Sequence, residues 1–421
     1  MDMFHMRSVS LSNLTHLDLN KNQLDGTITE EHFASARNLK YIDLSYNALK
    51  IDLRSDWKPP SQLDIVNFAS CRMGIADSLP QWFSDAFSNI KTLPTDMGSM
   101  SLRELYLTGQ IPTLPPNISI LDLSNNFLSG PLLSAVGSAN LKHLSLFSNQ
   151  IAGHIPKYFC KFQGLFELDL SNNFMEGELP SCLGVMEKIE FLALSNNGLS
   201  GEFPSFVQNF TNMLFLDLSR NKFSGGLPMW IGKLTSLAIL RLSHNMFYGN
   251  ILVNITNLVC LQYMDLKNNK ISSSLPSYFS NLKTMRMTHM RNICGMGYFY
   301  YPDLILIDHI DSFHLSSMSM VLKGQELNYG SINRVLGSSM MSMDLSCNNL
   351  IGKIPEEIVL LVGLVNLNLS WNHLSGVVPN KTSQGTCFQG KYQWRREWGA
   401  GGGQAPPGLV YNITSRLATN D

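Results

Sequence analysis

A short pattern, Leu-x-Leu-Ser-x-Asn, recurs about every 24 residues through the middle of this 421-residue chain, a period typical of stacked repeats. Regular copies occupy residues 168–173, 192–197, 216–221 and 240–245, and a variant that begins with Met264 follows at the same spacing. Other copies end in asparagine or cysteine at Asn22, Asn47, Cys71, Asn126, Asn149, Asn348 and Asn372. A fixed period of this length restricts the chain to repeat architectures, in which neighbouring repeats stack. We count about thirteen repeats.

Each part of the repeat indicates a local structure. In Leu-x-Leu the two leucines point to one side of a strand and the residue between them points to the other. The asparagine turns the chain, and its side-chain amide can satisfy backbone groups of the turn. A Gly-x-Ile-Pro element follows, as at residues 153–156, where glycine permits a bend and proline ends strand pairing. We therefore predict an α/β solenoid with a curved parallel sheet on its concave face and short helical or irregular turns behind.

Composition and charge count against several functional classes. Lys and Arg total 31 against 32 Asp and Glu, which leaves no basic surface for nucleic acid or an anionic membrane. The seven cysteines show neither a CxxC pair nor a zinc spacing, so we expect no metal and no cofactor. We also expect no enzyme, because no nucleophile, base or metal-spaced group accompanies the acidic residues.

Acidic residues nevertheless recur between the paired leucines, and they form a row that resembles a catalytic one. We interpret them as ordinary strand residues that are solvated on the concave face. The row consists of Asp18, Asp43, Asp122, Asp169, Asp217, Asp265 and Asp344. Likewise, we interpret Asp308, His309, Asp311 and His314 as a solvated loop, since their spacing matches no known set of metal ligands.

The extended pattern LxxLxLSxNxLxGxIP resembles the plant-type leucine-rich repeat of receptor-like kinases, receptor-like proteins and polygalacturonase-inhibiting proteins. The resemblance covers about residues 11–380. It implies a binding surface for a peptide, cell-wall or microbial ligand, and signalling through a partner receptor kinase. Of defence and development, we favour defence as the process served. The resemblance also implies a glycoprotein at the extracellular face of the plasma membrane. A secreted inhibitor of a pathogen enzyme such as polygalacturonase is the alternative.

Three interruptions divide the predicted repeats of residues 1–282 and 340–380. Residues 74–115 contain two shortened repeats, which we interpret as internal deletions. The gap between Asn269 and Asn348 is far longer than one period, and we assign residues 283–339 to a non-repeat island. Receptor-like proteins have a similar island, whereas the polygalacturonase inhibitors lack one. The tail, residues 381–421, is Gly-rich, carries no repeat and is expected to be disordered.

The ends of the chain lack features that the resemblance implies. No apolar segment of signal-peptide type precedes the first repeat, and no run approaches the roughly 20 apolar residues of a membrane helix. The cysteine-paired caps of the family are also missing. We therefore expect a chain truncated at both ends, and a non-functional receptor fragment is a third interpretation.

Candidate binding residues come from one column of the strands and from the island. Four successive repeats place Phe191, Phe215, Ile239 and Tyr263 just before Leu-x-Leu, and we expect them to form an exposed apolar stripe. Contiguous apolar surface commonly marks an interaction site. The remaining candidates are Arg241 beside the stripe and, in the island, Tyr298, Tyr300 and Lys323.

Two kinds of covalent modification are also expected. Asn-x-Ser/Thr sequons mark candidate glycosylation sites at Asn13, Asn117, Asn209, Asn254, Asn368, Asn380 and Asn412. A glycan on Asn368 would project onto the concave face and block a ligand. Cys160 and Cys182 follow their ladder asparagines by eleven and nine residues, which brings them close on adjacent turns. In an oxidising compartment they would form a disulfide.

Overall fold

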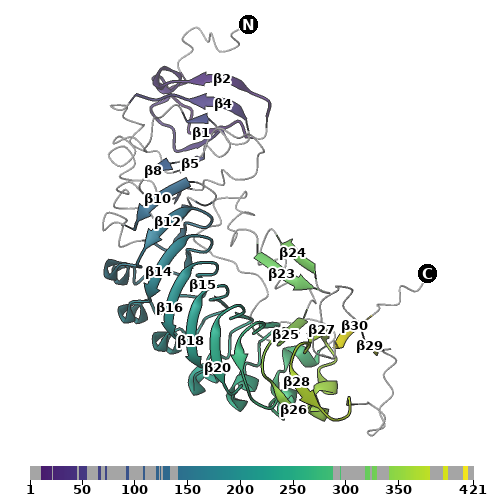
Figure 1. Ribbon diagram of the computed structural model, residues 1–421. Coiled ribbons are helices and arrows are strands. Elements are labelled where there is room, and N and C mark those ends of the chain that lie inside the picture. The colour runs from purple at the N-terminus through teal and green to yellow at the C-terminus, as the bar shows by residue number, and fades with distance from the viewer. Residues whose placement is uncertain are drawn as a thin grey trace, which may run out of the picture. The chain divides into compact units, whose positions relative to one another are not determined.

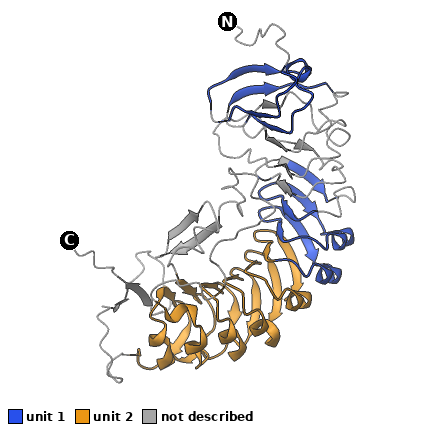
Figure 2. Cartoon of the chain, turned by 180° about the vertical axis from the view of Figure 1, so that it is seen from behind, with its two compact units in different colours: residues 1–189 blue, residues 190–421 orange. Residues whose placement is uncertain are grey.

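The computed structural model describes residues 11–54, 120–132, 141–287 and 341–379, apart from positions 21, 45–46, 123 and 125–126, together with Cys294 and eight short strands elsewhere. The chain forms two compact units, unit 1 (residues 1–189) and unit 2 (residues 190–421), which Figure 2 colours separately. Both units are built from the same repeat, and Figure 1 shows successive repeats stacked within each of them.

The Leu-x-Leu segments form the first sheet, as predicted. The repeat strands whose pairing is described are parallel, with a register shift between β25 and β27 at Met341. In unit 1 its strands are β1 (His16–Asp18), β3 (Tyr41–Asp43), β5 (Ile65–Asn67), β7 (Thr92–Leu93), β9 (Ile120–Asp122), β11 (His143–Ser145) and β13 (Glu167–Asp169). In unit 2 they are β15 (Phe191–Ala193), β17 (Phe215–Asp217), β19 (Ile239–Arg241), β21 (Tyr263–Asp265), β25 (Met341–Asp344) and β27 (Leu364–Asn368). These thirteen described strands agree with the predicted number of repeats.

A second series of short strands follows the asparagine of each repeat, and sequence reasoning did not anticipate it. In unit 1 these strands are β2 (Asp25–Ile28), β4 (Ala48–Ile51), β6 (Arg72–Met73), β8 (Thr108–Gly109), β10 (Phe127–Pro131), β12 (Gln150–Gly153) and β14 (Phe174–Glu178). In unit 2 they are β16 (Gly198–Glu202), β18 (Lys222–Gly226), β20 (Met246–Gly249), β22 (Lys270–Ile271), β26 (Ile351–Lys353) and β28 (His373–Ser375). The repeat glycine belongs to these strands. Gly225, for example, has a φ of +86°.

Where the turn behind a repeat lies among the described residues, it contains a short 3-10 helix, and the turn after β22 contains two. These helices are η1 (Glu30–Phe33), η2 (Lys157–Lys161), η3 (Ser181–Val185), η4 (Ser205–Asn209), η5 (Met229–Lys233), η6 (Val253–Asn257), η7 (Phe279–Asn281), η8 (Thr284–Arg286) and η10 (Glu356–Leu360). The repeat proline precedes five of them, as Pro228 precedes η5. Proline suits this position because its ring holds φ near the value required there. None of the described helices is long and apolar enough to cross a membrane.

The predicted asparagine ladder is present. Asn221 Nδ2 donates to the backbone oxygens of Leu194 (2.9 Å), Leu218 (3.2 Å) and Ser219 (3.2 Å), and its Oδ1 accepts from Leu199 N (3.0 Å). Each ladder asparagine therefore satisfies its own turn and the preceding repeat. The same contacts recur at Asn173, Asn245, Asn269, Asn348 and Asn372.

The core of unit 2 lies between the two sheets and the 3-10 turns. The paired leucines of the repeat are fully buried, and phenylalanines fill the space behind them. Phe223 and Phe247 stack with ring centroids 6.5 Å apart, and Phe203 meets the ring of Trp230 edge-on at 5.4 Å. Because each repeat contributes one layer of apolar side chains, burial depends on the neighbouring repeats.

The shortened repeats of residues 74–115 contribute strands to both sheets. β7 lies between β5 and β9 in the first sheet, and β8 pairs with β10 in the second. The rest of the segment lies outside the described residues. The shortened segment therefore still supplies one strand to each sheet. It does so although the sequence between Leu107 and Ile111 is shorter than the turn of a regular repeat.

The large insertion interrupts a single repeat. Met285 is buried at the position of the first repeat leucine, and its backbone oxygen accepts from Gly363 N (2.9 Å). The repeat resumes at Met341, where Ser342 N donates to Gln262 O (2.9 Å). The segment 286–340 thus separates the two halves of one repeat. Within it, β23 (Met318–Leu322) and β24 (Gln325–Tyr329) form an antiparallel hairpin.

Two further strands follow the last repeat. β29 (Tyr392–Arg396) and β30 (Tyr411–Ser415) pair with each other antiparallel, and β30 joins the first sheet at β27. These strands fall in the tail that the sequence analysis expected to be disordered. The remainder of that tail lies outside the described residues.

Candidate functional site

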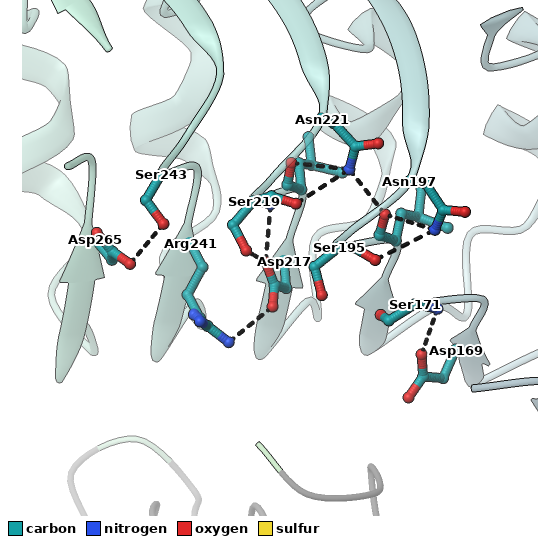
Figure 3. Close-up of polar contacts among 12 residues, drawn as sticks. Asp169, Ser171, Ser195, Asn197, Asp217, Ser219, Asn221, Arg241, Ser243 and Asp265 are labelled. Atoms are coloured by element: carbon teal, nitrogen blue, oxygen red, sulfur yellow. Dashed lines mark hydrogen bonds and ion pairs between the residues drawn. The ribbon is translucent and has the colours of Figure 1, made fainter. Parts of the chain in front are cut away.

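The acidic row of the strands is a network of buried hydrogen bonds (Figure 3). Asp217 Oδ1 accepts from the backbone N (2.9 Å) and the Oγ (2.6 Å) of Ser219, and Asp344 has the same contacts with Ser346. The carboxylate thus satisfies the backbone donor where its strand ends. The expectation of solvated side chains is wrong for the described members Asp43, Asp169, Asp217, Asp265 and Asp344, which are 2–5% exposed. Asp18, at the other end of unit 1, is exposed.

One cation balances part of this row. Arg241 of β19 donates from a terminal guanidinium nitrogen to Asp217 Oδ2 on β17 (2.9 Å), and both side chains are buried. Sequence reasoning placed Arg241 at the surface as a ligand anchor. Instead, Arg241 neutralises the buried carboxylate of Asp217, because an ionised carboxylate buried without a partner destabilises the folded state.

Asp265 on β21 has the strongest electrostatic perturbation in the described part of unit 2. Its pKa is raised from 3.8 to about 6, chiefly by burial and in smaller part by the neighbouring Asp344. Arg241 and the hydroxyl of Ser243, which donates to Asp265 Oδ2 (2.7 Å), act in the opposite direction. Asp265 therefore changes its charge near pH 6.

The expectation of an exposed apolar stripe is wrong. Phe191, Phe215, Ile239 and Tyr263 do align across β15, β17, β19 and β21, as predicted. Their exposed fractions, however, are only 6%, 3%, 0% and 1%, respectively. Side chains on an open sheet face would keep far more exposure. The stripe therefore contributes to packing in the folded chain.

A different column of side chains reaches the surface of unit 2. The residue before each ladder asparagine has a positive φ between 53° and 55°, and we name this set the left-handed column: Asn196, Arg220, His244, Asn268, Cys347 and Trp371. Few non-glycine residues adopt this conformation, although Asn and His do so more readily. Asn196, Arg220, Asn268 and Trp371 are exposed. Asn268 Nδ2 lies 2.8 Å from His244 Nδ1, so adjacent repeats contact each other along the column.

Unit 1 has a separate polar and aromatic cluster on β11 and β13. His143 Nδ1 lies 3.1 Å from Glu167 Oε2, and the imidazole stacks on Phe166 with centroids 6.3 Å apart. Lys188 Nζ lies 6.0 Å from the centre of the Phe166 ring. Sequence reasoning missed this cluster. The column immediately before Leu-x-Leu, read into the sixth and seventh repeats, would have revealed it.

The sequons differ in their surroundings. Asn13 and Asn209 are exposed, Asn254 is half-buried, and the Asn368 amide is engaged. Asn368 Nδ2 donates to Asp344 Oδ2 (3.0 Å), and its Oδ1 accepts from the Ser370 hydroxyl (2.8 Å). The other candidates fall on residues or side chains outside those described: Asn117, Asn380 and Asn412 for glycosylation, and Tyr298, Tyr300 and Lys323 for ligand binding.

Two disulfides are present among the described residues. Cys160 and Cys182 are bonded, as expected from their positions on adjacent repeats. Cys260 is bonded to Cys294, which ties the beginning of the insertion to the preceding repeat, and sequence reasoning missed this pair. Cys347 of the left-handed column is a free thiol. Among the described residues, no group of three or more His, Cys, Asp or Glu side chains is arranged to hold a metal ion.

Comparison with known sequences identifies the repeat. Seven segments match the family described as Leucine Rich Repeat: residues 13–34, 117–139, 140–162, 164–186, 188–210, 212–234 and 260–282. Two tomato (Solanum lycopersicum) proteins are similar over about a third of the chain. Receptor-like protein EIX2 is 37% identical over 132 residues, and receptor-like protein EIX1 is 32% identical over 134 residues. Each match spans only 12% of the tomato protein.

Two solved structures with the same fold are a TDR receptor and the complex PEPR1–AtPEP1. The TDR receptor and the PEPR1–AtPEP1 complex each have a TM-score of 0.63 and 24% identity over 87% of this chain, and these matches cover 57% and 46% of those chains, respectively. At this identity the likeness shows the fold alone. Taken with the matched repeats, it shows that the chain is a leucine-rich repeat solenoid, similar over about a third of its length to two tomato receptor-like proteins.

Proposed function

We propose that this chain is the ligand-recognition part of a plant receptor-like protein, acting at the extracellular face of the plasma membrane through a partner receptor kinase. Two structural neighbours support a peptide as the ligand. The Arabidopsis receptor kinase HAESA was solved with the peptide hormone IDA and the co-receptor SERK1, and RGFR1 was solved with RGF2. The tomato relatives support the receptor-like branch.

The left-handed column is the surface that supports this proposal best. The apolar stripe and the acidic row are buried, so a ligand cannot reach them without displacing other parts of the fold. The column instead offers polar groups on Arg220, His244 and Asn268, together with the half-exposed indole of Trp371. Aromatic and arginine side chains are frequent anchors at interfaces. Successive members lie in the turns that follow adjacent strands, which are about 4.8 Å apart, and this spacing suits an extended chain.

Binding to immobilised synthetic peptides tests this function. We would use AtPEP1, IDA and RGF2 as probes and measure association with the purified chain by biolayer interferometry. We expect one of these peptides to bind, and the His244→Asn and Trp371→Asn variants to weaken its binding tenfold or more. Asparagine tolerates the left-handed conformation, so these variants preserve the backbone. Lys222→Ala, an exposed substitution on β18, is the control and should bind as the parent does.

The same preparation tests the alternative function. A secreted inhibitor would reduce the activity of a polygalacturonase when the two are mixed. Inhibition without peptide binding would replace the receptor proposal. Absence of both activities would favour the interpretation of a non-functional fragment.

A role in defence is the finer part of the proposal and rests on the family resemblance alone. We expect plant tissue that expresses the complete receptor to produce reactive oxygen when its ligand is added. A developmental response without reactive oxygen would contradict the defence assignment while leaving ligand recognition intact.

A further inference from the structure

The acidic row of unit 2 pairs charges differently at successive contacts between strands. β17 and β19 place Asp217 opposite Arg241, and β19 and β21 place Arg241 opposite Asp265. Both contacts join opposite charges. β21 and β25 place Asp265 opposite Asp344, which joins two carboxyl groups. Among the described strands of unit 2, this contact is the one where two acids face each other.

The two carboxyl groups are poorly placed to carry two negative charges. Asp265 is 4% exposed and Asp344 is 2% exposed, so water screens neither of them well. Like charges directly opposite each other on adjacent strands destabilise the pair. The nearest cation, Arg241, is bonded to Asp217 on its other side. Tyr263, two residues before Asp265 on β21, is the remaining titratable neighbour on this strand.

Neutral donors stabilise each carboxylate separately. Asp265 accepts from the Ser243 hydroxyl (2.7 Å) and Lys267 N (3.1 Å). Asp344 accepts from Ser346 and from the Asn368 amide (3.0 Å). None of these bonds links Asp265 to Asp344. The contact between β21 and β25 therefore has no side-chain attraction within the acidic row, unlike the contact between β17 and β19.

The same contact joins segments that are distant in sequence. Paired residues of the regular repeats, such as Ile239 and Tyr263, are one period apart, whereas the whole insertion lies between the paired residues Tyr263 and Ser342. The closure entropy of a loop grows with its length. The contact between β21 and β25 is thus weakened by both chain topology and charge. Backbone bonds hold it, including Leu266 N to Asp344 O and Asn268 N to Ser346 O, both 2.9 Å.

We propose that the contact between β21 and β25 is a proton-sensitive hinge, which closes when Asp265, facing Asp344, takes up a proton from solvent and loosens when Asp265 is ionised. The proton removes one of the two facing charges and so relieves the repulsion between them. β25 and β27 then pack more tightly on the preceding repeats. The neighbouring contact between β17 and β19 does not share this property.

The direction of the pH effect follows from the titration of Asp265. Burial first, and Asp344 in addition, raise its pKa to about 6 from 3.8. An acid whose pKa is raised by folding stabilises the folded state most below its unfolded pKa. That contribution is lost as the pH rises through about 6. The hinge is therefore closed near pH 4 and loosened at pH 7.

Hydrogen exchange of single amides tests the hinge. We would measure protection factors at pH 5 and pH 7 in the full chain by mass spectrometry with electron-transfer fragmentation. Leu266 and Asn268 report on the hinge. Leu218 and Arg220 make the equivalent bonds to Arg241 O (2.9 Å) and Ser243 O (2.8 Å) and serve as the reference. We expect protection of the hinge amides to fall about tenfold or more relative to the reference as the pH rises.

Two variants decide the cause. In Asp265→Asn the titrating carboxyl group is gone, so the hinge amides should keep at pH 7 the protection that they have at pH 5. In Asp344→Asn the facing carboxyl group is gone while burial still raises the pKa of Asp265, so the pH response should be smaller than in the parent chain. Using both variants guards against a folding defect in either one. Equal pH responses of hinge and reference amides in the parent chain would overturn the proposal. A full pH response in folded Asp265→Asn, or an undiminished one in folded Asp344→Asn, would overturn it as well.

Discussion

At the scale of single residues, the site is governed by how buried charges are compensated. Asp217, Asp265 and Asp344 have the same place in their repeats, yet their partners differ. Asp217 has a guanidinium, whereas the other two have only hydroxyl and amide donors. Replacing both partners of a buried ion pair often changes stability little. Removing only one partner destabilises the fold, because it leaves an uncompensated buried charge.

We expect Arg241→Met to lower the free energy of unfolding by about 3 kcal/mol, because Asp217 would then be buried without its cation. Adding Asp217→Asn should recover much of the loss. Urea denaturation of the two single variants and the double variant measures this coupling. Lys222→Met, an exposed lysine on β18, is the control and should change stability by less than about 0.5 kcal/mol. A double variant no more stable than Arg241→Met would contradict the expectation.

At the scale of elements, most of the described repeats contain a glycine at a backbone position that disfavours side chains. Gly225 of β18 has a φ of +86°, and a methyl group there would lie 3.4 Å from Glu202 Cγ on β16. The adjacent Gly226 has an ordinary φ, and its nearest neighbour would be Tyr248 O at 3.9 Å. The two glycines therefore form a matched pair within one strand.

Gly225→Ala should lower the free energy of unfolding by about 1–2 kcal/mol, since an L-residue is strained at positive φ. Gly226→Ala should be neutral or slightly stabilising, because alanine restricts the unfolded chain without strain in the folded one. Thermal denaturation of both variants provides the comparison. Equal losses in the two variants would show that space, rather than backbone conformation, limits this strand.

At the scale of the whole molecule, the chain behaves as a row of stacked layers. Each layer contacts only its neighbours, so disturbances should remain local. The ladder shows why: Asn173 serves its own turn and, through Ile151 N at 3.0 Å, the preceding repeat. The side-chain hydrogen bonds of Asn173 all lie within these two repeats of unit 1.

We expect Asn173→Ala to destabilise its own and the preceding repeat by about 1–3 kcal/mol, the cost of unsatisfied buried backbone groups. Hydrogen exchange should accelerate at Ile151 and along β12 and β14, while β25 and β27 keep their rates. Asn250→Ala, at an exposed asparagine after β20, is the control. Acceleration throughout the chain would indicate a single cooperative unit and would contradict nearest-neighbour stacking.

The solenoid could be predicted from the sequence alone, because a regular repeat encodes its strand, its ladder asparagine and its glycine within a single period. It also indicated the Cys160–Cys182 bond, whose partners occupy neighbouring repeats. Local patterns of this kind need no knowledge of distant contacts.

Burial and pairing between distant segments were decided only by the tertiary structure. The apolar stripe has the same period whether its face is covered or open. Periodicity therefore could not show whether Phe215 packs inside the fold or lies on a binding surface. The Cys260–Cys294 bond and the facing of Asp265 and Asp344 likewise depend on where the chain returns after the insertion. Such long-range contacts arise from how the whole chain closes, and no single repeat contains that information.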